Sequence, residues 1–445
     1  MKLSRRTFMQ SGAASFGVGA LSLSPFSAVA DWSQCGQPFK AVVGIDLAGG
    51  NDGFNMFVPA SGDSAAQYQA IRQSLALDSA NSIALEGSNL AMHPSMSALK
   101  KWWQNRSMLP ILNQGPLIKP LTNQTIDTSN SPTHLYSHSH QSTMVQSHTA
   151  STWVSKQGFG ALTAKILEKM PLSMQDMPPL FDIAGTQVWT NALEAQATSV
   201  GVKPPSNIFS EDEGFDVTLF NNLHDKSQQS NVFKQHYAHL ATESRGLYHE
   251  FSSIFDTDTG DDFPQTKLGQ QLATVFKLII NKDKFDHPIQ YFSCKLGGFD
   301  THSNQLNAQT ALLEELAEAL DAFHTALERH GLHDNVVSFT HSEFGRTLTP
   351  NATQGTDHGW GSHSLVMGGA IDGARILGDY PDLSENSEYL LSRGRIIPTI
   401  ASDQIHATVL SWLGLRPSGI DLLFPALKRS NSEFPSQTLP LFKPC

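Results

Sequence analysis

One short stretch sets a carboxylate and an imidazole where a buried strand should end. In "GFDTHSNQ", Asp300 and His302 follow the apolar run at 287–298. In an extended segment, residues i and i+2 project from the same face, so both side chains can reach one ion. Imidazole nitrogen and carboxylate oxygen are ligands of Zn and related divalent cations. The pair indicates a metal site or, more commonly for a single pair, a hydrogen-bonded surface contact.

The same pattern recurs twice later in the chain. Glu343 and Arg346 lie in "HSEFGRT", and Asp357, His358 and His363 lie in "GTDHGWGSH". Each cluster adjoins an apolar run that is typical of a strand. Three such clusters favour a phosphate-type site or a divalent metal site, with Zn, Ca, Mg or Mn as the ion.

A glycine-rich turn follows the first apolar run. In "AGGNDGFN", residues 48–55, the glycines permit a close approach of backbone and ligand, and Asp52 would stand at the mouth of the sheet. Asp46, at the end of the run, is a second candidate ligand. The turn lacks the spacing of a dinucleotide or P-loop fingerprint. A plain turn is an equally good interpretation.

A fourth segment, "HLYSHSHQSTMVQSH" at 134–148, is rich in histidine and serine. A serine at a helix N-terminus that faces a divalent ion can ionise and attack, because the helix dipole and the metal both favour the alkoxide. Ser137, Ser139 and Ser142 are candidates, with His138 beside the first. The alternative is an N-cap serine among solvated histidines.

Strand-like and helix-like segments alternate along the chain. We expect buried strands at 39–47, 108–115, 178–185, 287–298, 335–340 and 364–371, and helices at 93–107, 160–170, 266–282 and 310–331. Alternation of this kind predicts an α/β fold with a mainly parallel sheet covered on both faces. Ligands bind such sheets beyond the carboxyl ends of the strands, which is where the motifs above should lie.

The first 30 residues have the features of an export signal. Arg5 and Arg6 precede a modest apolar stretch, and Ala28–Ala30 fits a signal-peptidase site, so the mature chain should begin near Asp31. "SRRTFMQ" resembles a twin-arginine signal, read by the twin-arginine translocase, although a chance arginine pair in an ordinary signal is the alternative. Pro25 interrupts a stretch too short to span a bilayer, so we expect a periplasmic or secreted protein without a stable membrane anchor.

The composition of the chain bears on its binding partners, its domain organisation and its cysteines. The net charge of −11, with no basic run, argues against nucleic acid as a partner. Residues 31–445 suit one large α/β domain with insertions, of which 194–265 is the best candidate, or two domains. Cys294 is expected to be buried in a strand. Cys35 and Cys445 flank the mature chain and either pair or remain free.

The order of the motifs resembles the domain-of-unknown-function 1501 family. The motifs are "GGNDGFNMFVP", "MHPSMSALKKWW", "SHSHQSTMVQS", "GFDTHSNQ", "HSEFGRT" and "DHGWGSHSLVMGG", and they extend from about residue 40 to about 415. Members of that family are often exported by the twin-arginine pathway and are related to the alkaline phosphatase and sulfatase superfamily. The resemblance implies an alkaline-phosphatase-like three-layer α/β/α sandwich with a metal site at the carboxyl edge of the sheet.

The resemblance also implies roles for particular residues. Asp52 takes the place of the first-strand carboxylate ligand, Ser137 that of the nucleophile, and Asp300 with His302 that of the later Asp and His. "SEF" stands where the superfamily has Asp-His, so Glu343 can replace the aspartate but Phe344 cannot bind a metal. His358 then takes the final histidine position, with Asp357 and His363 as additional ligands. The missing ligand favours a single metal or an inactive relative.

Together these features predict an exported metal-dependent hydrolase of phosphate or sulfate esters. Ser137, beside His138, would attack an anionic ester carried by a small molecule or a glycan. Arg346 would clamp an equatorial oxygen of the transferred group or form an ordinary salt bridge. The alternative is an inactive exported binding or assembly protein that keeps the fold.

Overall fold

The computed structural model describes residues 39–78, 80–147, 157–167, 178–193, 195–206, 214–285 and 287–444. The predicted export signal at 1–30 and the two terminal cysteines, Cys35 and Cys445, lie outside the described residues. Cys294 is buried and has a free thiol, as expected. Within the described ranges, no helix combines the length and the apolar character needed to cross a membrane.

The centre of the molecule is an eight-stranded sheet with the order β13-β5-β10-β9-β1-β8-β6-β7. Its strands are β1 (Lys40–Ala48), β5 (Met108–Gly115), β6 (Leu180–Asp182), β7 (Thr198–Ser199), β8 (Ile289–Gly297), β9 (Val336–His341), β10 (Ser362–Met367) and β13 (Ile400–Ala401). Strand β10 is antiparallel to β5 and β9, while the other neighbours are parallel. The prediction of a mainly parallel sheet is confirmed.

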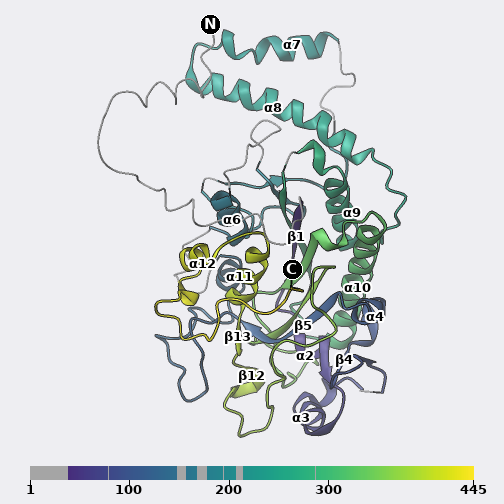
Figure 1. Ribbon diagram of the computed structural model, residues 1–445, viewed down its shortest axis with the longest axis vertical. Coiled ribbons are helices and arrows are strands. Elements are labelled where there is room, and N and C mark those ends of the chain that lie inside the picture. Colours follow the sequence, from purple (N-terminus) through teal and green to yellow (C-terminus); the bar gives the residue numbers. More distant parts are fainter. Residues whose placement is uncertain are drawn as a thin grey trace.

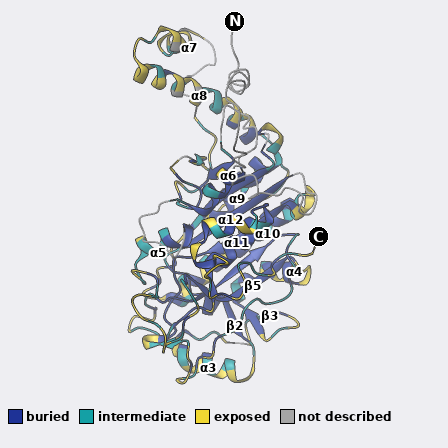
Figure 2. Cartoon of the chain, turned by 60° about the vertical axis from the view of Figure 1, so that its left-hand side comes forward, coloured by how far each residue is buried: buried dark blue, intermediate teal, exposed yellow. Residues whose placement is uncertain are grey.

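Helices cover both faces of this sheet (Figures 1 and 2). They are α4 (Lys100–Gln104), α9 (Lys267–Ile280) and α10 (Gln305–Arg329) on one face, and α6 (Phe159–Leu167), α11 (Ser402–Trp412) and α12 (Pro417–Leu423) on the other. Alternate residues of β1 divide between the two cores, since Val43 packs with α9 and α10 while Val42 packs with α6 and α11. The three-layer α/β/α class is confirmed.

Smaller elements lie around the carboxyl edge of the sheet. They are α2 (Gly53–Met56), α3 (Gly62–Arg72), the small sheet of β2 (Phe57–Pro59), β4 (Leu90–Met92) and β3 (Ile83–Ala84), helix α5 (His138–Gln146), and the hairpin of β11 (Leu390–Leu391) and β12 (Arg395–Ile396). Helix α2 packs against β10, and α3 packs against β2. Together these elements surround the ends of β1, β8 and β9.

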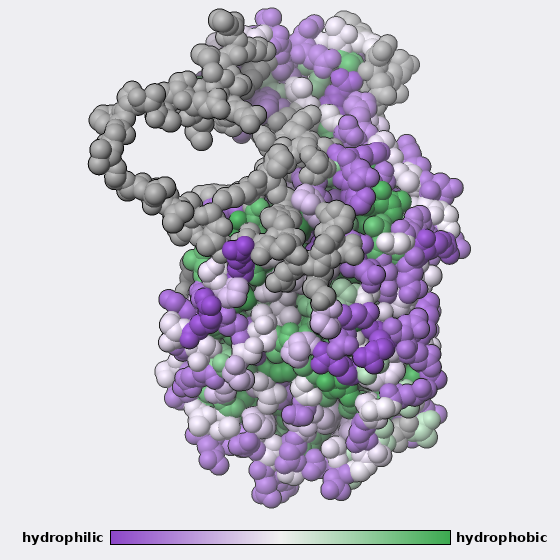
Figure 3. Space-filling view, viewed as in Figure 1, coloured by the Kyte–Doolittle hydropathy of each residue, from purple (hydrophilic) through white to green (hydrophobic). Residues whose placement is uncertain are grey.

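Helices α7 (Phe215–Leu223) and α8 (Val232–Phe255) extend away from the body of the molecule (Figures 1 and 2). The last turn of α8 is anchored, because Ile254 is buried in the core that α9 and α10 form with the sheet. Val232 and Phe233, at its other end, are 77% and 86% exposed. On the face of the molecule in Figure 3, hydrophilic side chains predominate and apolar ones lie between them. Both helices fall within the predicted insertion at 194–265, whose boundaries remain a prediction.

The register of the three central strands brings their carboxyl ends together. Ala48 of β1 pairs with Gly297 of β8, and Asp46 of β1 pairs with His341 of β9. Gly49 follows with φ at +120°, and a Cβ atom there would lie 2.3 Å from the backbone nitrogen of Asp300. Only glycine fits this close approach without displacing the Asp300 loop.

We expect Gly49→Ala to destabilise the fold and to displace Asp300. Gly62→Ala is the matched control, because Gly62 also has a positive φ, +75°, but open space around its Cβ position. The control should lose about 1–2 kcal/mol of unfolding free energy, the cost of the left-handed conformation alone. Urea unfolding of both variants checks this expectation, and equal losses would contradict it.

Candidate metal centre

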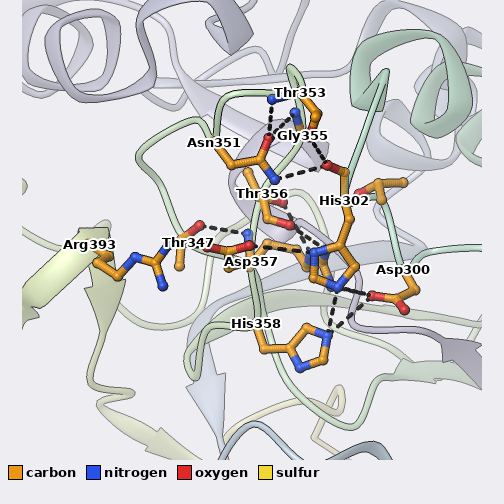
Figure 4. A network of polar contacts seen from close by, with 12 residues as sticks. Asp300, His302, Thr347, Asn351, Thr353, Gly355, Thr356, Asp357, His358 and Arg393 are labelled. Atoms are coloured by element: carbon orange, nitrogen blue, oxygen red, sulfur yellow. Dashed lines mark hydrogen bonds and ion pairs between the residues drawn. The ribbon is translucent and has the colours of Figure 1, made fainter.

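Asp300 is the centre of a cluster of histidines beyond the end of β8. Its Oδ1 atom lies 3.0 Å from His302 Nε2 and 3.2 Å from His358 Nε2, and its Oδ2 atom lies 3.4 Å from His138 Nε2. The Nε2 atoms of His302 and His358 are 3.0 Å apart. Figure 4 shows Asp300, His302 and His358 pointing toward one another. The Asp300 side chain is 45% exposed, so the cluster is open to solvent.

The outer nitrogen of each histidine faces an acceptor. His358 Nδ1 donates to the Tyr136 carbonyl at 2.7 Å, and His138 Nδ1 lies 2.8 Å from Glu343 Oε1. His302 Nδ1 faces Asp357 Oδ1 at 3.5 Å. A carbonyl only accepts, so His358 carries its hydrogen on Nδ1 and, when neutral, turns the Nε2 lone pair inward. Carboxylates that accept from Nδ1 orient metal-binding histidines in the same way.

The donor set fits a divalent cation. Three imidazole nitrogens and a carboxylate oxygen are typical ligands of a Zn-type ion. Among the described residues, one ligand atom each of His138, Asp300 and His358 lies within 4.8 Å of the other two, as a shared cation requires. His302 Nε2 lies beside two of them, 3.0 Å from Asp300 Oδ1 and 3.0 Å from His358 Nε2. The Nε2 atoms of His302 and His358 are 3.0 Å apart, and two lone pairs at that distance repel each other. A proton or a cation therefore has to lie between the two nitrogens.

The surroundings of the cluster favour the ionised form of Asp300 and the neutral form of His358. Burial opposes ionisation of Asp300, but the hydrogen bond and charge of Arg346, with His302 and His138, outweigh it and lower the pKa of the carboxyl. Burial, with the charges of Arg346 and His138, lowers the pKa of His358. At neutral pH we therefore expect an ionised Asp300 and a neutral His358, the forms that bind metal.

Arg346 is fully buried beneath the cluster. Its Nη1 donates to Asp300 Oδ1 at 2.9 Å and to the Gly49 carbonyl at 3.2 Å. Its Nε and Nη2 donate to the hydroxyl and the carbonyl of Thr356, at 3.1 and 2.5 Å. Four of the five guanidinium N–H groups thus hold protein atoms. The residue fixes Asp300, and its role as a clamp on substrate remains a prediction.

Asp52 lies at the start of α2 with 1% of its surface exposed. Its Oδ2 accepts from the buried guanidinium of Arg72 and from Gln305 Nε2. Gln305 in turn accepts from Thr356, which accepts from Arg346. Asp52 is thus connected to the Asp300 cluster through a buried network. Its direct binding of a metal remains a prediction.

His363 of β10 lies in the core with 2% exposure. Its Nδ1 accepts from the Asn113 backbone at 3.0 Å, and its ring packs on Phe54 at 4.3 Å. Burial lowers the pKa of His363 to about 3, so the imidazole is neutral at physiological pH. His363 thus contacts the core residues Asn113 and Phe54. Its role as a metal ligand remains a prediction.

Ser137 is the N-cap of α5. It lies between Tyr136 and His138, which both contact the cluster. Consecutive Cα atoms are about 3.8 Å apart, so the Ser137 backbone runs along the edge of the cluster. Its hydroxyl lies 2.9 Å from His140 Nδ1.

With this geometry established, the comparisons identify the family. Residues 39–418 match the family described as "Protein of unknown function (DUF1501)". The chain belongs to this family. No curated protein matches the sequence.

Several solved structures are similar to this DUF1501 chain at low identity. A protein of the alkaline phosphatase superfamily from Vibrio parahaemolyticus is 10% identical, with a TM-score of 0.35, over 87% of this chain and 69% of that chain. The C-terminal periplasmic domain of EcEptC from Escherichia coli, in complex with Zn, is 8% identical with a TM-score of 0.34, over 93% and 95%. The phosphonate monoester hydrolase SpPMH from Silicibacter pomeroyi is 8% identical with a TM-score of 0.34, over 88% and 75%.

Sequence reasoning missed several residues that support the site of this DUF1501 protein. Arg72 and Gln305 hold Asp52, and Thr356 holds Arg346. Arg72 lies outside every motif, whereas Gln305 and Thr356 lie within "GFDTHSNQ" and "GTDHGWGSH". An amide and a hydroxyl in these motifs do not by themselves indicate which side chain they bind. The Tyr136 carbonyl is a backbone group, and every residue has one, so its contact with His358 leaves no trace in the sequence.

We expect Glu343→Gln to weaken metal binding about 10- to 100-fold, because the carboxylate that orients His138 is replaced by a neutral amide. Asp357→Asn should have a smaller effect, since Asp357 lies 3.5 Å from His302 whereas Glu343 lies 2.8 Å from His138. Competition with a coloured chelator measures both affinities. The reverse order of effects would show that Glu343 does not orient His138.

Proposed function

We propose that this protein is an exported metal-dependent hydrolase of phosphate or sulfate esters. The proposal is carried by the convergence of His138, His302 and His358 on the Asp300 carboxylate. Ser137, which bears a hydroxyl, directly precedes His138 in the chain. The cluster lies at the carboxyl edge of the sheet, where α/β proteins bind ligands. The order of the family motifs supports the same function.

Under this proposal the metal ligands are Asp300, His138, His302 and His358. Glu343 and Asp357 act on the outer nitrogens of two of these histidines. A divalent cation bound there would lower the pKa of a nucleophile and neutralise charge on the transferred group. The exposure of Asp300 leaves an open side for substrate, as catalytic metal sites require.

The residues of the chain position the reacting groups. Arg346 holds Asp300 ionised and fixed, and the Tyr136 carbonyl fixes the ring of His358. Ser137, at the N-terminus of α5, is the proposed nucleophile toward phosphorus or sulfur. The partial positive charge of the helix end favours its alkoxide and an anionic substrate.

The test starts from protein purified without chelator. Metal analysis is followed by assays with 4-nitrophenyl phosphate and 4-nitrophenyl sulfate, with Zn, Mn, Mg and Ca supplied in turn. We expect bound metal and turnover of one ester class, with turnover lost in Ser137→Ala and kept in Ser139→Ala, whose serine is exposed on the same helix. Bound metal without turnover would favour the binding-protein alternative, and the absence of both would refute the proposal.

The export part of the proposal rests on the predicted signal alone. Replacing Arg5 and Arg6 together by lysine should leave uncleaved precursor in the cytoplasm, because the translocase reads the arginine pair. Cell fractionation followed by blotting measures the precursor. Normal export of the variant would show that an ordinary secretory signal is used.

A further inference from the structure

The hydroxyl of Ser137 faces an imidazole instead of capping its helix. An N-cap serine usually accepts from a backbone N–H of the first turn, but the Ser137 side chain makes no such bond. Its Oγ lies 2.9 Å from Nδ1 of His140, three residues later on the same face of α5. Ser139 Oγ lies 3.5 Å from the same nitrogen, a weaker approach. The structure therefore favours Ser137 as the hydrogen-bond partner.

The His140 ring is held in place by a second imidazole. His134 stacks on it, with ring centroids 4.2 Å apart and planes inclined by 28°. The chain reverses between the two rings through His134 and Tyr136, which both have positive φ angles. This packing restricts rotation of the His140 ring, so that Nδ1 stays directed at Ser137.

His138 is unsuited to deprotonate Ser137, although it is adjacent in sequence. Its Nδ1 contacts Glu343, and its Nε2 faces Asp300 at 3.4 Å. Both of its nitrogens therefore belong to the metal-type cluster. His140 is the histidine whose ring nitrogen meets the Ser137 hydroxyl.

We propose that His140 is the general base that activates Ser137. This inference rests on the proposed hydrolase function for its substrate. As the Ser137 Oγ–phosphorus or Oγ–sulfur bond forms and the bond to the leaving oxygen breaks on the opposite side, the Ser137 proton passes to His140 Nδ1 and the leaving oxygen takes a proton from solvent. In the second half, water attacks the serine ester and releases a proton to solvent, while His140 returns its proton to Ser137 Oγ as the bond to Oγ breaks.

A fluorophosphonate probe tests the serine–histidine pair apart from ester turnover. Attack by Ser137 forms an Oγ–phosphorus bond, expels fluoride and transfers the serine proton to His140. The labelled residue is located by peptide mass spectrometry. We expect labelling of Ser137 in the wild-type protein, a rate at least about 100-fold lower in His140→Ala, and an unchanged rate in Ser129→Ala, whose exposed serine pairs with Asp127.

Two further measurements separate catalysis from structure. Added imidazole should restore labelling of His140→Ala, because a small base can enter the space left by the ring, whereas a merely structural loss would not respond. His140→Gln serves as a second variant, and circular dichroism checks that both are folded. Labelling of Ser137 combined with inactivity toward esters would support the pair and refute the proposed substrate class. Wild-type labelling rates in both His140 variants, or no labelling of Ser137, would overturn the inference.

Discussion

Replacement of Asp300 by alanine should remove most of the bound metal and lower thermal stability with it. Within the described ranges, the Asp300 carboxylate forms ion pairs with all three clustered histidines and with Arg346. Its loss should weaken binding by more than about 100-fold, the upper range for loss of an orienting partner. A metal present at 100 times its Kd stabilises the native state by about 2.7 kcal/mol, and the variant should forfeit most of that contribution.

Metal analysis and thermal unfolding, each with and without chelator, measure the two effects together. His302→Ala should shift both in the same direction. Asp283→Ala is the control, because its carboxylate is 89% exposed and pairs only with Lys282 among the described residues. If Asp300→Ala retains its metal, the histidine cluster is a structural corner and the proposed hydrolase fails with it.

Arg72→Ala should be among the most destabilising single substitutions in the described part of the chain. Arg72 and Asp52 form an ion pair in which the side chains are 0% and 1% exposed. Removal of the cation leaves a buried, uncompensated carboxylate, which costs about 3–5 kcal/mol. Arg429→Ala, which breaks an exposed pair with Asp421, should cost less than about 1 kcal/mol. Urea unfolding in the presence of chelator compares the two without a contribution from metal.

A substitution of Asp52 distinguishes a metal ligand from a structural partner of Arg72. Asp52→Asn should lose stability but keep its metal, because Asp52 is linked to the Asp300 cluster through Gln305, Thr356 and Arg346 and is not in the group of ligand atoms around Asp300. Metal analysis of the folded variant reads this directly. A loss of metal as large as that in Asp300→Ala would instead make Asp52 a ligand, as the family resemblance implies.

The sequence predicted the layers and the edge of the sheet that carries the site. Continuous apolar runs such as that of β1 and β8 reveal strands buried on both faces, and polar residues after them mark the carboxyl edge. Periodicity does not report strand direction, so the antiparallel pairing of β10 was not foreseen.

The contacts between side chains could not be predicted from the sequence, for a different reason. The residue types at the site were evident, but whether Glu343 faces an ion or a histidine depends on rotamers and on the helix opposite. His138 reaches Glu343 from α5, an element that approaches the sheet from elsewhere in the chain. Similarly, Arg72 belongs to no motif, and only the packing of α3 brings it to Asp52.

The contacts around Asp300 join segments that only the assembled sheet brings together. His138 and Glu343 are 205 residues apart, and Tyr136 and His358 are 222 residues apart. The central strands pair across still longer separations, as Lys40 does with Ile289, but the side chains around Asp300 can meet only when those strand ends are aligned. These contacts should therefore be absent from the folding nucleus and form on the assembled sheet. Metal would then leave the refolding rate unchanged and slow unfolding instead, so that the ion lengthens the lifetime of the native protein without guiding its formation.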